Sequence, residues 1–258
     1  MIRIGSGRND WEVSAHSADL RRTPQPAHIA SIVAEPQSVT IDVSRTAVIV
    51  VDMQNDFCSQ GGWLDYIGAD YTPLREPVER QNIFLARMRR EGVPIIWLNW
   101  GNRPDRLNLS PSVLHVYNGT GDGIGIGEPL PVNGSKVLEK GSWGSEILEE
   151  LEVWPGDIRV DKYRMSGFWD TPLDSILRNL RTDTILFAGV NLDQCVMATL
   201  QDAVNSGYDA LLLKDLCATN SPAYCIEATY YNIKQCYGFL TDSEAVMRAL
   251  DTSISSLI

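Results

Sequence analysis

The sequence is poor in histidine and contains no long apolar run. Its 258 residues include only three histidines, His16, His28 and His115, so a nucleophile that depends on a histidine base has little material to draw on. The longest wholly aliphatic stretch covers residues 47–51, whereas a membrane helix needs roughly 20 apolar residues. We therefore expect neither a histidine-based catalytic apparatus nor a membrane helix.

Basic residues and paired cysteine motifs are also scarce. The 22 Lys and Arg residues against 33 Asp and Glu residues give a net charge of −11, which disfavours a nucleic-acid partner and favours a small-molecule substrate. The five cysteines contain no C-x-x-C pair and are odd in number, which argues against a disulfide framework and a zinc ribbon. The composition therefore predicts reduced thiols and a cytoplasmic location.

The chain divides into an N-terminal arm, residues 1–44, and one larger domain, residues 45–258. The arm has little periodicity and a Pro24-Gln-Pro26 break, so it is predicted to be irregular. It is either a disordered leader or an arm that wraps a neighbouring subunit, which Trp11, Ile29 and Ile32 favour because these side chains are poorly suited to water.

In the larger domain, apolar strands alternate with amphipathic helices. This order predicts an α/β fold with a mainly parallel sheet that helices cover on both faces. The predicted strands are 46–51, 94–98, 157–161, 184–189, 210–213 and 238–241, and the predicted helices are 77–90, 172–180, 195–205 and 222–236.

Three chemically distinctive residues each follow a predicted strand. Asp52 follows the run 46–51, Lys162 follows 157–161, and Cys195 stands after a polar turn where a helix is predicted to begin. Alone, each has an ordinary interpretation: a loop acid, a solvated lysine and a buried cysteine. Together they favour a catalytic site, because ligand sites lie beyond the carboxyl ends of parallel strands and because a helix start and a cation both stabilise a thiolate.

Four sequence motifs resemble those of the isochorismatase-like cysteine hydrolases, and the likeness extends over residues 45–245. The motifs are VDMQN at 51–55, GGWL at 61–64, KGSW at 140–143 and SGFWDTPLDSILR at 166–178. Members of this family use Asp, Lys and Cys in the order found here and fold as a three-layer α/β sandwich. Within the family, the sequence is most similar to the ureidoacrylate and biuret-type hydrolases.

The resemblance implies an amidohydrolase that cleaves a C–N bond of a small linear amide or ureido compound and releases ammonia through a covalent acyl-enzyme. It implies Asp52 as base, Lys162 as the cation and Cys195 as nucleophile, with no cofactor. The backbone N–H of Cys195, together with that of Asn191 or Leu192, would hold the oxyanion. Residues 100–106 contain no histidine of the kind that binds a metal in nicotinamidases, so no metal is expected. A homo-oligomer, dimer or tetramer, is also expected.

The substrate pocket is predicted from polar and aromatic residues near the strand ends. Residues 107–131, with their GDGIGIG run at 121–127, are predicted to form a flexible flap whose His115 and Tyr117 are placed to meet substrate or a partner subunit. Arg103, Arg106 and Arg164 are candidates to bind a substrate carboxylate. The predicted substrate-binding residues are Gln54, Asn55, Phe57, Trp63, Asn99, Trp100, Phe168, Thr219 and Asn220.

Two other functions remain open from the sequence. One is vinyl-ether hydrolysis on the same fold, as in isochorismatases, where no thiol nucleophile is required; the presence of Cys195 counts against it. The other is a binding module without catalysis, against which the intact set of Asp52, Lys162 and Cys195 argues.

Overall fold

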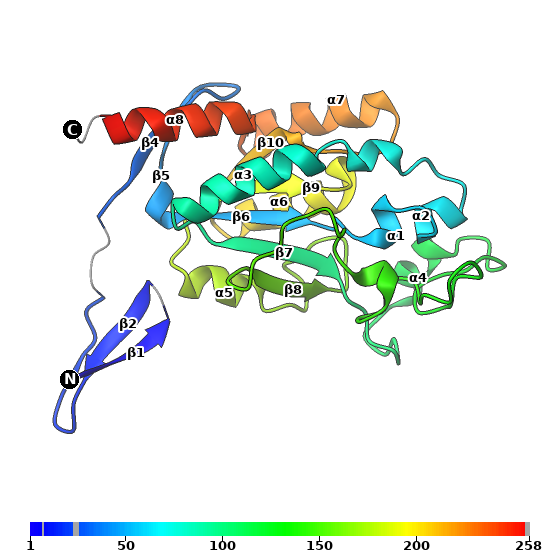
Figure 1. Ribbon diagram of the computed structural model, residues 1–258, viewed down its shortest axis with the longest axis horizontal. Helices are drawn as coiled ribbons and strands as arrows, with labels where there is room; N and C mark the ends of the chain where they lie inside the picture. The colour runs from blue at the N-terminus through cyan, green and yellow to red at the C-terminus, as the bar shows by residue number, and fades with distance from the viewer. Residues whose placement is uncertain (7, 23–25, 256–258) are drawn as a thin grey trace.

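The computed structural model describes residues 1–6, 8–22 and 26–255, and a six-stranded sheet forms its centre (Figure 1). Every strand pairing in this sheet is parallel, and the strand order is β11-β10-β9-β6-β7-β8. The strands are β6 (Thr46–Val51), β7 (Ile95–Trp100), β8 (Ile158–Lys162), β9 (Thr184–Gly189), β10 (Asp209–Cys217) and β11 (Phe239–Thr241). The predicted mainly parallel sheet is confirmed.

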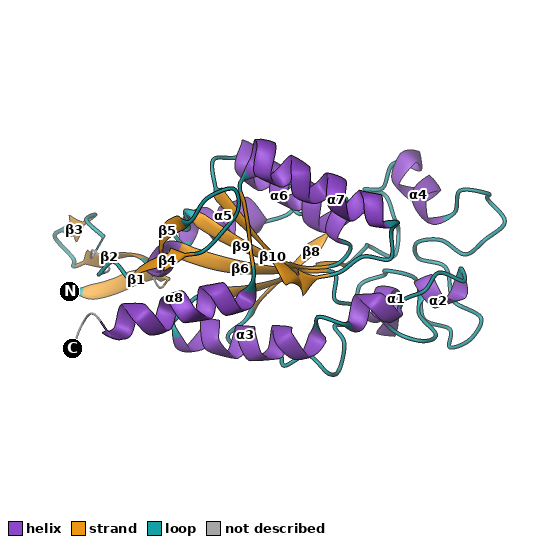
Figure 2. Ribbon diagram, turned by 90° about the horizontal axis from the view of Figure 1, so that it is seen from above, coloured by secondary structure: helices purple, strands orange, loops and turns teal. Residues whose placement is uncertain are grey.

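The two central strands show why the sheet is parallel and covered. All six residues of β6 and all six of β9 are buried, which requires cover on both faces. Figure 2 shows α3 (Val78–Arg90) and α8 (Ser243–Ser255) on one face and α5 (Leu173–Asn179), α6 (Met197–Asn205) and α7 (Ala223–Asn232) on the other. The chain is therefore a three-layer α/β sandwich.

Short helices follow several strands or close loops around the sheet. The predicted helix 77–90 is confirmed as α3, and the predicted helix 222–236 is split because α7 gives way to a π-helical turn at Ile233–Tyr237. The remaining short elements are α1 (Asn55–Cys58), α2 (Trp63–Tyr66), α4 (Pro111–Tyr117) and 3₁₀ turns at Val43–Arg45, Thr72–Arg75 and Trp143–Ser145. Among the described residues, no helix is both long and apolar enough to span a bilayer.

The prediction of an irregular arm was wrong for the parts of residues 1–44 that the structure describes. An antiparallel three-stranded sheet contains β1 (Ile2–Ser6), β2 (Asn9–Val13) and β3 (Ala18–Asp19), and β4 (Ile29–Ile32) pairs with β5 (Val39–Asp42). These strands have two to five residues each. Strands of that length carry too few alternations for a clear period of two.

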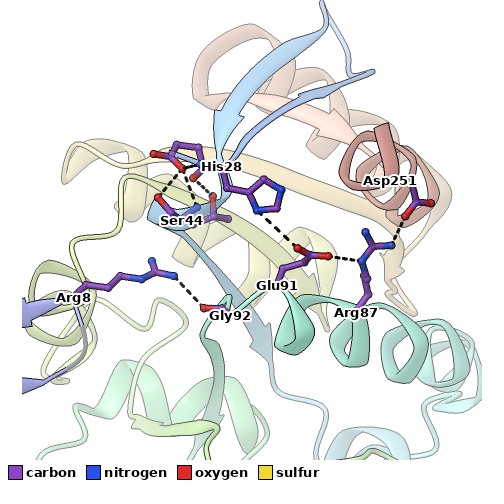
Figure 3. Close-up of polar contacts among 9 residues, drawn as sticks. Arg8, His28, Ser44, Arg87, Glu91, Gly92 and Asp251 are labelled. Carbon is purple, nitrogen blue, oxygen red and sulfur yellow. Dashed lines mark hydrogen bonds and ion pairs between the residues drawn. The ribbon is translucent and has the colours of Figure 1, made fainter. Parts of the chain in front are cut away.

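Polar contacts attach the arm to the end of α3 (Figure 3). Arg8 donates to the Gly92 carbonyl oxygen at 3.1 Å, and His28 Nδ1 lies 3.8 Å from Glu91 Oε2. Arg87 forms ion pairs with Glu91 at 2.7 Å and with Asp251 of α8 at 2.6 Å. Polar contacts therefore link the arm to α3, and α3 to α8.

The second hairpin of the arm also contributes to the hydrophobic core, which gives a matched pair of variants on β4. Ile32 is 0% exposed and belongs to the core, whereas Ile29 on the same strand is 51% exposed. We expect Ile32→Ala to lower the free energy of unfolding by about 2–5 kcal/mol, because it removes buried methyl groups and leaves a cavity. Ile29→Ala should change it by less than about 0.5 kcal/mol. Equal effects in urea denaturation would contradict the placement of β4.

Candidate active site

The three predicted catalytic residues come from three strand ends at one edge of the sheet. Asp52 directly follows β6, Lys162 ends β8, and Cys195 lies just beyond β9. The strand order is β9-β6-β7-β8, so β8, which carries Lys162, lies two strands away from β6, which precedes Asp52. At the usual spacing of about 4.8 Å between strands, the two backbones are roughly 10 Å apart. The lysine stem must therefore reach across the end of β7.

A glycine lets the end of β9 lie against the end of β6. Gly189 has a φ of 113°, and a Cβ atom at this position would stand 2.1 Å from the carbonyl oxygen of Val51. Only glycine combines this backbone conformation with such a close approach. The next residue, Val190, donates its N–H to the same Val51 oxygen at 2.9 Å. The turn that carries Cys195 is thereby held beside Asp52, whose own φ of 50° is one that Asp tolerates better than most residues.

The turn before Cys195 differs from the predicted helix start. A π-helical turn covers Leu192–Val196, and α6 begins only at Met197, so Cys195 lies within the first helical turn rather than opening it. The peptide bond between Val190 and Asn191 is cis. The Asn191 carbonyl oxygen accepts the N–H groups of Gln194 and Val196, at 3.1 and 3.2 Å. These bonds fix the turn around the thiol.

The side chains of Asp52, Lys162 and Cys195 meet in a buried cluster. Lys162 Nζ lies 3.0 Å from Asp52 Oδ2, and their side chains are 0% and 1% exposed. The same ammonium donates to Cys195 Sγ at 3.4 Å. It also donates to the Arg164 carbonyl oxygen at 3.1 Å and lies 3.9 Å from the centre of the Trp100 ring. One cation thus joins the acid to the thiol.

Burial controls the protonation of this cluster. Burial raises the pKa of the Cys195 thiol to about 12; the Lys162 charge opposes that shift, while the Asp52 charge reinforces it. Burial also raises the pKa of Asp52, against the attraction of Lys162 and a hydrogen bond from Cys195. The predicted helix start and the cation favour a thiolate, but burial opposes them, so forming the thiolate requires transfer of the Cys195 proton to a base.

One predicted oxyanion donor is already engaged. The N–H of Leu192 donates to the Ala218 carbonyl oxygen at 2.9 Å, so it is not available to a substrate. The predicted set of donors narrows to the N–H groups of Asn191 and Cys195. The sequence did not indicate this bond, because Ala218 lies just beyond the distant strand β10.

Comparison with known proteins agrees with this geometry. A family model described as the isochorismatase domain matches residues 46–245. The chain belongs to the isochorismatase family. This family member is 34% identical over 217 residues to ureidoacrylate amidohydrolase RutB of Klebsiella variicola (strain At-22), an alignment that covers 84% of this chain and 92% of the relative. RutB of Cronobacter sakazakii (strain ATCC BAA-894) is 33% identical over 224 residues, covering 85% of this chain and 94% of that protein.

Solved structures give the same family fold. A cysteine hydrolase from Pseudomonas syringae pv. phaseolicola 1448A superposes with a TM-score of 0.70 at 26% identity, covering 86% of this chain and 98% of that one. N-carbamoylsarcosine amidase from Thermoplasma acidophilum superposes with a TM-score of 0.57 at 25% identity, covering 77% and 96%. This isochorismatase-family hydrolase therefore shares its fold with a cysteine hydrolase and an amidase.

Two amide side chains predicted to bind substrate instead hold loops together. Gln54 donates to the carbonyl oxygens of Trp100 and Ser145, at 2.8 and 2.7 Å, and accepts the Trp100 N–H at 2.9 Å. Asn55 donates to the Trp143 carbonyl oxygen at 2.8 Å and accepts from the Ser59 hydroxyl. Because these hydrogen-bonding atoms are taken up within the protein, the contacts assign both side chains a structural role and give no support to direct substrate binding.

Four other predicted substrate residues have contacts within the protein. Thr219 donates to Asp193 at 2.6 Å, and Asn220 donates to the Asp70 carbonyl oxygen at 3.1 Å. Phe168 packs against Tyr208, with ring centres 5.9 Å apart. Asn99 precedes Trp100 on β7, so strand alternation turns their side chains to opposite faces of the sheet, and Asn99 lines a cavity of about 250 Å³ to which Trp100 also contributes. The sequence located strand ends correctly but could not give these directions.

Three of the predicted aromatic residues are buried, and one of them contacts the cluster. Trp100 contacts the Lys162 ammonium, and Trp63 and Phe57 are buried in the adjoining loops. Sequence reasoning missed Met165, whose Sδ lies 3.6 Å from Cys195 Sγ, because a methionine in a loop carries no functional signal.

The three arginines predicted as candidates for a substrate carboxylate all have partners within the protein. Arg103 pairs with Asp105, and Arg164 pairs with Asp170. Arg106 donates to the Ile126 carbonyl oxygen. Within the described chain, no group of three or more His, Cys, Asp or Glu residues is placed to hold a metal.

Proposed function

We propose that this isochorismatase-family hydrolase cleaves the terminal C–N bond of a small ureido compound and releases ammonia, with Cys195 as its nucleophile. The observation that carries the proposal is the position of the Lys162 ammonium, 3.0 Å from Asp52 Oδ2 and 3.4 Å from Cys195 Sγ. A nucleophile, a base and a cation in mutual contact are what thiol-dependent acyl transfer requires.

The first half of the reaction forms an acyl-enzyme. Asp52 takes the Cys195 proton, which its contact with the thiol allows, and Lys162 stabilises the sulfur charge as it forms. The thiolate attacks the terminal ureido carbonyl carbon, and the backbone N–H groups of Asn191 and Cys195 hold the oxyanion. The C–N bond then breaks, and the proton on Asp52 passes to the leaving nitrogen, which departs as ammonia.

The second half restores the thiol. Asp52, now ionised again, takes a proton from water as the water oxygen attacks the thioester carbon. The C–S bond breaks, the sulfur recovers the proton from Asp52, and the carbamate leaves. The overall change consumes one water and releases one ammonia, and every proton passes through Asp52.

The preference for a ureido substrate rests on the relatives. Ureidoacrylate amidohydrolase is the name of the relatives that are 33–34% identical over 84–85% of this chain, and N-carbamoylsarcosine amidase is a structural neighbour. Both names describe compounds with a carbamoyl group on nitrogen. We therefore assign ureidoacrylate-like compounds ahead of biuret and simple carboxamides.

A substrate panel tests this assignment. We expect purified protein to release ammonia from ureidoacrylate or a close ureido analogue with kcat/KM at least about 10-fold above that for nicotinamide, because the relatives are named for ureido and carbamoyl compounds. The threshold corresponds to about 1.4 kcal/mol of transition-state binding. Isochorismate serves as a further arm, with pyruvate as its readout. Pyruvate release without ammonia release from any ureido compound would overturn the proposal in favour of vinyl-ether hydrolysis.

A further inference from the structure

The nucleophile is covered in this structure, and the segment predicted as a flap lies at the same end of the sheet. Cys195 is only 5% exposed. In Figures 1 and 2, α4 lies beyond the carboxyl ends of the strands, on the same side as α1 and α2. Because α4 belongs to residues 107–131, this segment reaches the edge of the sheet from which the catalytic cluster projects.

Tyr117, the last residue of α4, carries this segment into the aromatic surroundings of the cluster. Its side chain is buried, at 5% exposure. Its ring centre lies 4.9 Å from that of Trp63 and 5.4 Å from that of Trp100, with the Trp100 contact edge-to-face. Trp100 in turn contacts Lys162 Nζ at 3.9 Å. A single aromatic ring therefore separates Tyr117 from the ammonium that joins Asp52 to Cys195.

Tyr117 forms no side-chain hydrogen bond among the residues that the structure describes, and its hydroxyl oxygen is not one of the fully buried, unpartnered side-chain atoms in that part of the chain, so this oxygen keeps access to solvent. A tyrosine with a packed ring and an accessible hydroxyl can offer that hydroxyl to a ligand. Burial raises the pKa of Tyr117 well above its usual value, and the charges of Cys195, Asp52 and Asp56 act in the same direction. The phenol is thus close enough to the cluster to experience its charges, and it remains neutral.

We propose that Tyr117 is a substrate-binding residue on a movable lid formed by residues 107–131, and that its hydroxyl hydrogen-bonds the ureido group. The inference rests on the proposed function. A neutral phenol both donates and accepts hydrogen bonds, which suits a group that presents a carbonyl oxygen beside N–H groups. The rings of Tyr117 and Trp100 provide flat walls for a planar substrate.

Two side chains near the cluster donate hydrogen bonds to the lid. Trp63 Nε1 donates to the Ile124 carbonyl oxygen at 3.0 Å, and Arg164 Nη2 donates to the Asn108 carbonyl oxygen at 2.9 Å. The backbone oxygen of Arg164 also accepts from Lys162. Substrate must reach a thiol that is 5% exposed, so the lid has to open before the ureido group binds.

Kinetics of Tyr117→Phe test the substrate contact. This variant keeps the ring that packs on Trp63 and Trp100 and removes only the hydroxyl. We expect kcat/KM for the ureido substrate to fall about 10-fold or more, the loss typical of one hydrogen bond in a buried site. Tyr224→Phe, a control at an exposed position on α7, should behave as wild type. Full activity in Tyr117→Phe would overturn the contact.

Alkylation of Cys195 tests the lid without any turnover. The labelling rate with iodoacetamide is measured at the Cys195 peptide by mass spectrometry. We expect Tyr117→Ala, which shortens the covering side chain, to label at least 10-fold faster than wild type, and Tyr117→Phe to label at the wild-type rate. Tyr117→Leu provides a second truncation if Tyr117→Ala loses its native circular dichroism. Equal rates in wild type and the truncated variants would overturn the lid.

The two failures are distinguishable. If the wild type releases no ammonia from any ureido compound, the proposed function is wrong and so is the ureido contact, and the lid is judged by alkylation alone. If ammonia is released but Tyr117→Phe is unaffected and truncation leaves alkylation unchanged, the proposed function stands and the role of Tyr117 is wrong.

Discussion

Cys195→Ser is expected to lower kcat for the ureido substrate on the order of 10³-fold or more, with little change in the fold. The hydroxyl occupies almost the same volume as the thiol but ionises far less readily, and the buried site disfavours the charged form of either group. Lys162 at 3.4 Å and Asp52 remain in place, so the variant isolates the nucleophile from the rest of the cluster. Steady-state release of ammonia is the measurement.

Two controls make this result specific. Cys236→Ser changes an exposed cysteine and should retain wild-type turnover. Cys195→Ala removes the nucleophile entirely and should be at least as inactive as the serine variant. Turnover above about 10% of wild type in Cys195→Ala would show that the thiol is not the nucleophile, because loss of a covalent nucleophile normally costs several orders of magnitude.

Lys162→Met is expected to abolish turnover and also to lower the free energy of unfolding by about 3–5 kcal/mol, the usual effect of removing one partner from a buried ion pair. The side chain keeps a similar length but loses the charge that Asp52 contacts at 3.0 Å. Asp52 would then be buried without its cation, and the contact between the ammonium and the Trp100 ring would also be lost. Urea denaturation and ammonia release are the two measurements.

The double variant Asp52→Asn/Lys162→Met separates stability from catalysis. It removes both charges, so it should recover most of the stability that Lys162→Met loses, while remaining inactive because it has neither base nor cation. A double variant no more stable than Lys162→Met would contradict the ion pair as the source of the loss. Normal turnover in Lys162→Met would contradict the role of the cation.

The sequence allowed the sheet and the three central residues to be predicted for one physical reason. Parallel strands that are buried on both faces leave continuous apolar runs, such as residues 46–51 and 184–189, and those runs are easy to recognise. The residue that follows such a run lies at the carboxyl edge of the sheet, whatever the loops do. Asp52, Lys162 and Cys195 were placed at this edge by that logic and by their resemblance to a family.

Side-chain direction could not be predicted, and the substrate-binding set depended on it. Asn99 and Trp100 are neighbours in the sequence, yet strand alternation sends them to opposite faces. The sequence leaves the Gln54 amide without a visible partner, but the fold brings the Ser145 carbonyl oxygen within hydrogen-bond distance of it. Such partners lie far away along the chain, so no local pattern reports them.

Burial is a property that the sequence could not supply, and it has the largest effect on the pKa of Cys195. The Lys162 charge acts to lower the pKa of Cys195, but desolvation is the larger cause and raises that pKa to about 12. The contacts of Tyr117 with Trp63 and Trp100 join separate loops and strands. The pattern of residues 107–131 predicts a flap with His115 and Tyr117 as candidates, and only the fold shows which aromatic rings Tyr117 contacts.

Rapid quenching during turnover tests the central claim most directly. Enzyme and ureido substrate are mixed, stopped with acid after successive intervals from milliseconds to seconds, digested and analysed by peptide mass spectrometry. The account predicts an acyl group on the Cys195 peptide that appears with the first ammonia and disappears when substrate is exhausted. An acyl group on a different residue, or steady turnover while Cys195 stays unmodified at every interval, would contradict it.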